Sequence, residues 1–118
     1  MDQNIRATFQ VSTFYYFMII FSMTSIGQLI TMLTIVFADI TGKELLVTAT
    51  VVATAFFGAF GTVRILTNMS LLLNEMDDKT AATNYGREMQ AIPLLVLRFV
   101  FAAVFIIVAI IQIITIFT

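Results

Sequence analysis

The fold is decided by residues 61–79, which read GTVRILTNMSLLLNEMDDK. A long apolar run ends at Arg64, yet the ten residues that follow remain rich in Leu, Ile and Met before the acidic residues begin. Several apolar residues after Arg64 recur at the spacing of one helical face: Ile65, Met69, Leu72, Leu73 and Met76. The pattern predicts a helix that passes a membrane interface at Arg64 and continues into water.

Three long uncharged segments give the fold class. The chain has 118 residues, of which 60% are hydrophobic and only 11% are charged, whereas soluble domains carry roughly 25% charged residues. The segments without any charged side chain are residues 7–38, 45–63 and 99–118. Each matches the length of about 20 apolar residues that a helix needs to cross a bilayer. We therefore expect an all-α integral membrane protein with three transmembrane helices.

The three helices are expected to form one membrane domain that comprises residues 1–118. Their predicted extents are about residues 5–38, 44–76 and 91–118. The connection DITGK at residues 39–43 is too short for anything but a reversal, so neighbouring helices are expected to pack as an antiparallel bundle.

Three other features are expected at or between the helix ends. Gly42 supplies a permissive backbone position for the reversal. Residues 77–90 are predicted to form a polar loop, since they contain few apolar residues and include Asn84 and Gly86. Pro93 is expected either in the first turn of the last helix or at a kink within a longer helix, because proline lacks a backbone N–H.

The basic residues predict the orientation. Lys43 is the one basic residue expected on the side of the first connection, and five lie on the other side: Arg6, Arg64, Lys79, Arg87 and Arg98. Basic residues near span ends stay on the inner side of a membrane. We therefore expect the N-terminus inside and the C-terminus outside, in a bacterial cytoplasmic membrane.

Arg64 and Arg98 are expected at one depth, at the inner interface. The apolar cores that remain are residues 17–38, 45–63 and 99–118, with lengths of 22, 19 and 20 residues. The helices then extend about 15–18 Å beyond the membrane on the N-terminal side, at about 1.5 Å per residue. Two guanidinium groups on inward-facing stripes call for an anion: lipid phosphate, a carboxylate, or a phosphate-bearing substrate.

Polar side chains inside the predicted spans follow helical spacing. The candidates for contacts within the membrane are Gln28, Thr31, Thr50, Thr54 and Gln112. By depth, we expect Gln28 near Thr54, and Gln112 near Thr31 or Thr50. One interpretation is hydrogen bonding between helices, which contributes about 0.6–2 kcal/mol per contact. The other is a hydrophilic path or a solute site.

Small residues on the second predicted helix form candidate packing positions: Ala55, Gly58, Ala59 and Gly61. Spacings of four between small residues let another helix approach closely. The partner helix belongs either to the same chain or to a second subunit.

Composition narrows the function classes. Cys and His are absent, which removes disulfides, zinc–thiolate sites and the usual haem ligand. The net charge of −1 does not favour a nucleic-acid partner. Phosphate-binding loops and nucleophile elbows are missing, so we expect no catalytic residue, cofactor or metal.

These observations predict a non-catalytic integral membrane subunit rather than an enzyme. Its role is expected to be structural or accessory, within a homo-oligomer or a larger membrane complex. The expected partners are membrane lipids and other membrane subunits or copies of the chain. The alternative is a pore or transport component, in which the Thr and Gln stripes line a path within an oligomer.

Overall fold

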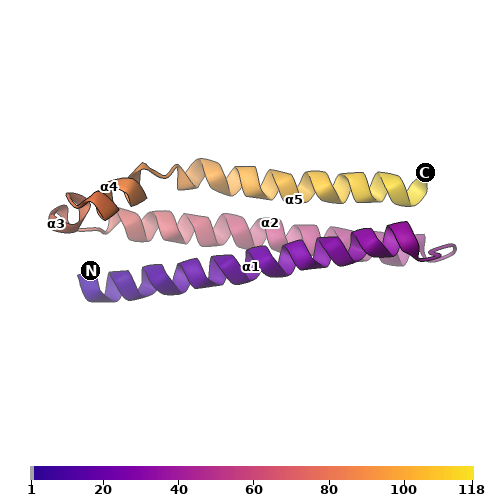
Figure 1. Ribbon diagram of the computed structural model, residues 1–118, viewed down its shortest axis with the longest axis horizontal. Coiled ribbons are helices and arrows are strands. Elements are labelled where there is room, and N and C mark those ends of the chain that lie inside the picture. Colours follow the sequence, from indigo (N-terminus) through magenta and orange to yellow (C-terminus); the bar gives the residue numbers. More distant parts are fainter. Residues whose placement is uncertain (1) are drawn as a thin grey trace.

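Five helices account for most of residues 2–118, which are the residues that the computed structural model describes. They are α1 (Gln3–Phe37), α2 (Glu44–Asn74), α3 (Asp78–Ala81), α4 (Asn84–Ala91) and α5 (Leu94–Phe117). The molecule measures 60 × 21 × 17 Å (Figure 1). Helices α1, α2 and α5 are each long and apolar enough to cross a membrane.

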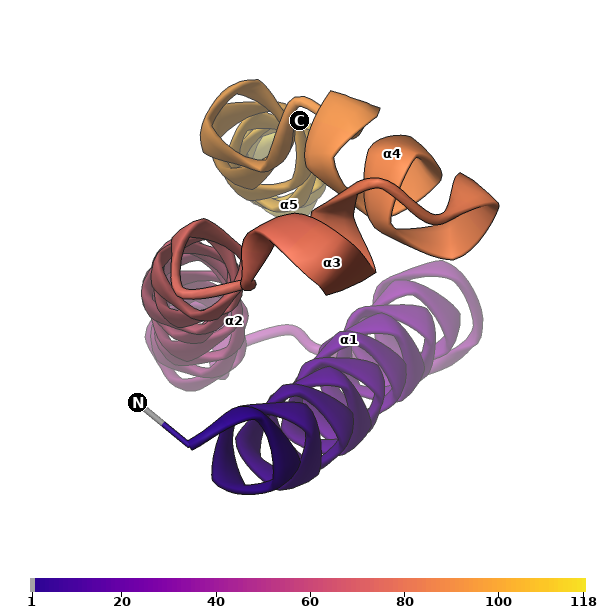
Figure 2. The ribbon, with the colours of Figure 1, turned by 90° about the vertical axis from the view of Figure 1, so that its left-hand side faces the viewer.

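The ends of the long helices meet in two groups. The N-terminus, α3 and α4 lie at one end of the molecule, and the C-terminus and the connection after α1 lie at the other (Figure 1). Gln3 Nε2 donates a hydrogen bond to the Glu75 carbonyl at 3.0 Å, which joins the start of α1 to the end of α2. Helix α2 packs against both α1 and α5, and the end-on view shows α4 on the side where α5 and α1 face each other (Figure 2).

The connection between α1 and α2 is a tight reversal. The Asp39 carboxylate accepts a hydrogen bond from the Thr41 backbone N–H at 3.0 Å. Hydrogen bonding from the Thr41 side chain, and then from this backbone N–H, lowers the pKa of the carboxyl group. Gly42 has a φ of 80°, a left-handed conformation that costs glycine little. The permissive position predicted at Gly42 is therefore used.

Residues 77–90 are not the polar loop that the sequence predicts, because they contain α3 and α4. Asp77 caps α3 by accepting from the Thr80 N–H at 2.7 Å, and Thr83 caps α4 by accepting from the Gly86 N–H at 3.0 Å. Asp and Thr occur both in loops and at helix N-caps, so composition alone does not separate the two. The last helix starts at Leu94 rather than at about residue 91, and Pro93 is its N-cap.

Two groups of buried apolar residues hold the helices together. One lies between α2 and α5 and contains Val51, Ala55, Ala109 and Ile116. The other contains Met69, Leu73 and Met76 of α2 and its C-terminal turn, packed against Ala81, Met89 and Leu94. Helix α2 continues for ten residues past Arg64, about 15 Å, and α3 and α4 cover the apolar face of this continuation.

Candidate functional site

The buried face of α1 is entirely polar. Its buried residues are Arg6, Gln10, Thr24, Gln28 and Thr31. They recur at intervals that place them on one side of the helix, and the large apolar side chains of α1 point outward. A soluble amphipathic helix buries the opposite kind of face, whereas lipid accepts apolar side chains on an outer surface.

Gln28, Thr31 and Gln112 form a buried hydrogen-bonded group between α1 and α5. Gln28 Nε2 donates to the Phe105 carbonyl at 2.9 Å, and Gln112 Nε2 donates to the Gln28 carbonyl at 2.9 Å. Thr31 Oγ1 bonds to Gln112 Oε1 at 3.1 Å and to the Gln28 carbonyl at 2.9 Å. We name these three side chains the glutamine cluster. Such contacts within apolar surroundings each contribute about 0.6–2 kcal/mol.

Thr50 and Thr54 do not belong to the glutamine cluster. Thr54 Oγ1 donates to the Thr50 carbonyl at 2.9 Å, and Thr50 Oγ1 donates to the Leu46 carbonyl at 3.1 Å. Threonine on a helix satisfies its hydroxyl in this way without a partner helix. Thr54 lies beside Gly27, the neighbour of Gln28 in the chain, but Gln28 directs its amide to α5.

A second polar group ties α1 to α4 at the opposite end of α1 from the glutamine cluster. Arg6 is only 4% exposed. The Arg6 Nε donates to Gln3 Oε1 at 2.9 Å, and the Arg6 Nη1 donates to Gln10 Oε1 at 2.6 Å. Gln10 Nε2 donates onward to the Tyr85 hydroxyl at 2.9 Å. Arg6 therefore does more than mark the orientation expected from the sequence. Its four-residue spacing from Gln10 is the pattern that predicts a contact along one helical face.

Asp77 lies close to this second group. Hydrogen bonding from the Thr80 side chain and then from its backbone N–H lowers the pKa of Asp77, and the positive charge of Arg6 adds a smaller effect. A carboxyl group with a lowered pKa stabilises the fold above its ordinary pKa, and that contribution disappears as the pH falls through the lowered value. The α3 cap is therefore retained at neutral pH.

Arg98 lies between α5 and α2. One of its guanidinium nitrogens donates to Thr67 Oγ1 at 2.7 Å, and its Cζ lies 4.6 Å from the centroid of the Phe99 ring. Its Nε is buried and has no hydrogen-bond partner. Thr67 follows Arg64 by three residues, which is about 4.5 Å along the helix, so the two arginines lie within about one helical turn in height.

Arg64 is exposed, which corrects the prediction that it lies on an inward-facing stripe. The buried face of α2 is instead built from apolar and small residues, among them Ala55, Ala59 and Leu66. At 100° per residue, Arg64 projects from the opposite side of the helix. Small side chains let neighbouring helices approach closely, which a guanidinium on that face would prevent.

The predicted packing residues divide between two neighbours. A Cβ on Gly58 would lie 2.6 Å from Thr24 Oγ1, and a Cβ on Gly61 would lie 3.2 Å from Ile20, so both glycines face α1. Ala55 and Ala59 lie toward α5 and line a groove between the two helices.

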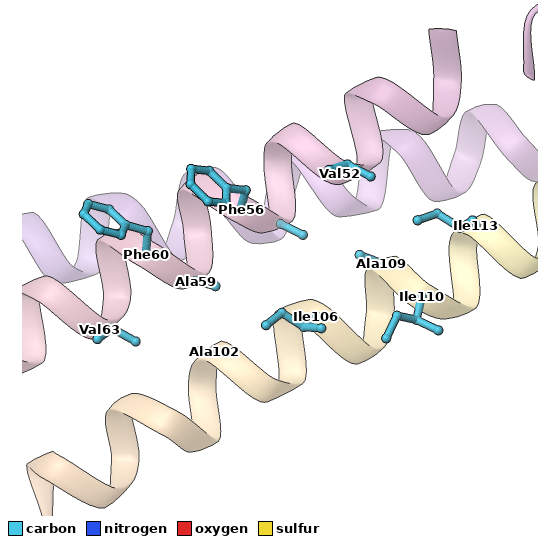
Figure 3. A pocket seen from close by; sticks show the side chains of 11 residues that line it. Val52, Phe56, Ala59, Phe60, Val63, Ala102, Ile106, Ala109, Ile110 and Ile113 are labelled. Atoms are coloured by element: carbon cyan, nitrogen blue, oxygen red, sulfur yellow. The ribbon is translucent and has the colours of Figure 1, made fainter. Parts of the chain in front are cut away.

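The groove between α2 and α5 has a volume of about 490 Å³ (Figure 3). Phe56 and Phe60 project from α2, and Ile106 and Ile110 project from α5. The other residues that line it are also apolar: Val52, Ala55, Ala59, Val63, Ala102, Ala109 and Ile113. The groove is therefore suited to an apolar occupant.

The buried polar side chains of this protein mainly serve helix packing. In the glutamine cluster, each side chain is hydrogen-bonded to another helix or to another member of the cluster. Comparisons with family models, with curated proteins and with solved structures gave no match to this chain.

Proposed function

We propose that the protein is a non-catalytic integral membrane subunit, in which α1, α2 and α5 cross the bilayer as an antiparallel bundle. The shortest of them, α5, has 24 residues and is about 36 Å long, enough for a hydrocarbon core of about 30 Å. The polar face of α1 turned inward and the bulky apolar side chains turned outward support this placement.

The observation that carries the subunit role is apolar surface beyond the proposed membrane. Phe9 of α1 and Leu71 of α2 are 49% and 58% exposed. With Tyr16 and Leu72 they form the apolar part of a cleft of about 530 Å³, whose other lining residues are polar: Ser12, Thr13, Asn68, Asn74 and Glu75. Phe9 precedes Tyr16 in α1, and Leu71 follows Arg64 in α2. Both therefore belong to the parts of the helices that extend beyond the proposed membrane into water. Exposed apolar surface in water marks a contact with another protein.

The occupant of this cleft is proposed to be another copy of the chain or a different membrane subunit. Leu71→Ser is expected to lower the mass of the particle purified in mild detergent from an assembly to a single chain. Leu46→Ser is the matched control, because Leu46 is also exposed on α2 but lies within the proposed span. Native mass spectrometry of both variants and the natural chain measures the subunit number.

The subunit proposal is contradicted if the natural chain purifies from its own membrane as a monomer without protein partners. It also fails if Leu46→Ser and Leu71→Ser reduce assembly equally, because then the projecting end has no special role. Helical content by circular dichroism shows whether either variant is unfolded.

A pore has less support than a subunit role. Gln28, Thr31 and Gln112 are buried and hydrogen-bonded within the chain. The hydroxyls of Thr50 and Thr54 are bonded to carbonyls of their own helix. Gln28, Thr31 and Gln112 would have to give up those partners to line a path for water, and Thr50 and Thr54 alone are too few to form one.

The proposed orientation places the N-terminus, α3 and α4 inside and the C-terminus outside a bacterial cytoplasmic membrane. The group of five basic residues defined above supports it. Lys79 and Arg87 belong to α3 and α4, and the other three lie in the parts of α1, α2 and α5 nearer to these short helices. The chain has no Cys, so single cysteines report position cleanly. In intact cells, Thr41→Cys is expected to react with an impermeant maleimide and Ala82→Cys only after lysis. The opposite result reverses the orientation.

A further inference from the structure

The face between α2 and α5 changes from apolar to polar along its length. The groove of about 490 Å³ ends on α2 at Val63. Thr67, the partner of Arg98, comes next. A second cleft of about 310 Å³ follows, with a polar lining that includes Ser70, Asn74 and Gln90. Val63, Thr67, Ser70 and Asn74 are spaced by four, three and four residues, so they lie on one face of α2.

Helix α5 repeats the same order. Its groove residues end at Ala102, Arg98 lies one turn closer to the N-terminus of the helix, and Leu94 lines the polar cleft. Arg98 of α5 and its partner Thr67 of α2 therefore lie between the apolar groove and the polar cleft. A phospholipid has the same order of chemistry, with acyl chains, then a phosphate, then a polar head group.

Arg98 has hydrogen-bonding capacity that the chain does not use. A guanidinium carries five N–H donors. The Nε of Arg98 is enclosed by protein atoms and one terminal nitrogen donates to Thr67, which leaves the remaining terminal N–H groups for an anion. The residues that line the groove and the polar cleft include no carboxylate. A phosphate oxygen is the acceptor that a guanidinium recognises best, because charge and fork geometry both match.

We propose that this face binds one anionic phospholipid, with an acyl chain in the apolar groove and its phosphate on Arg98. The head group then lies in the polar cleft beside Ser70, Asn74 and Gln90. This site rests on the proposed crossing of the membrane by α2 and α5. An apolar helix from another subunit could fill the alanine-lined groove, but it would offer no anion to the Arg98 guanidinium.

The test titrates the full chain in mild detergent with phosphatidylglycerol or phosphatidylcholine and counts bound lipids by native mass spectrometry. One phosphatidylglycerol is expected to bind more tightly than phosphatidylcholine, since the net-negative lipid complements the cationic face. Arg98→Gln is expected to weaken this binding about tenfold or more, as for the loss of a charge-assisted hydrogen bond. Arg64→Gln is the matched control, because it removes an equal charge within one turn in height but from a residue outside the groove lining. The affinity of the Arg64→Gln variant for phosphatidylglycerol should change by less than about twofold.

Val63→Phe provides a second, uncharged variant that fills the inner end of the groove and is also expected to weaken phosphatidylglycerol binding. Equal losses in Arg98→Gln and Arg64→Gln would show attraction of lipid to general surface charge and overturn the site. Unchanged phosphatidylglycerol binding in Arg98→Gln and Val63→Phe also overturns the lipid site. The site is likewise overturned if these variants change the subunit number but not the number of bound lipids. The same spectra report subunit number, so failure of the lipid site is distinguished from failure of the subunit role.

Discussion

Gly58→Leu is expected to separate α1 from α2 and to abolish the folded bundle. A Cβ on Gly58 would lie 2.6 Å from Thr24 Oγ1 and 3.0 Å from Thr24 Cβ. Thr24 is buried, and a β-branched side chain on a helix has few rotamers through which to move away. A whole leucine side chain therefore forces the helices apart. The loss is measured as the free energy of unfolding in mixed micelles, by circular dichroism.

A graded series checks the source of this loss. Gly58→Ala is expected to cost about 1–2 kcal/mol, because overpacking of about 1–3 kcal/mol is partly offset by the helix propensity of Ala, up to about 1 kcal/mol. Thr24→Ala in the same chain should recover most of that cost, since it removes the atoms that collide. A cost of Gly58→Ala that is independent of residue 24 would falsify the contact as its cause.

Gly86→Ala is expected to detach α4 while the long helices remain folded. A Cβ on Gly86 would collide with the Thr80 carbonyl oxygen and lie 2.8 Å from Ala81 Cα. Both obstacles are backbone atoms, so no side-chain rotation relieves the collision. Overpacking of this kind costs about 3 kcal/mol or more, enough to undo a short helix. Hydrogen exchange is expected to show loss of protection across residues 78–91 and retention of protection in α2 and α5.

Gly42→Ala serves as the comparison for Gly86→Ala. A Cβ on Gly42 meets no atom within 4 Å, and only its φ of 80° disfavours a side chain. Gly42→Ala should therefore lower the free energy of unfolding by about 1–2 kcal/mol. It should leave the hydrogen-exchange protection of α4 unchanged. If Gly86→Ala proves as mild as Gly42→Ala, the turn between α3 and α4 is more tolerant than its geometry indicates.

The sequence predicts the features that lipid chemistry dictates. Helix length is one, because an uncharged run of about 20 residues is what a bilayer requires, and the structure has three helices of the necessary length and composition. The polar face of α1 is another. Gln10, Thr13, Thr24, Gln28 and Thr31 recur at helical spacing, and all of them except the half-buried Thr13 are buried.

The sequence predicts less well which side of α2 is buried. This helix is apolar on nearly every side, so periodicity offers two candidate faces: the polar one with Arg64 and the small one with Ala55 and Ala59. The small face is buried, since close packing between helices favours small residues there. The two short helices were missed for another reason, because Asp77 and Thr83 look the same in a loop as at a helix N-cap.

The glutamine cluster has a consequence for biosynthesis. Gln28 and Gln112 are separated by 84 residues in the chain, so the ribosome makes the first long before the second. If α1 and α5 cross a bilayer as proposed, the Gln28 amide lacks its acceptor on α5 until the last helix is inserted. A chain that stalls before α5 would therefore hold an unsatisfied amide within apolar surroundings, at a cost in free energy. Insertion of the last helix supplies the missing acceptor.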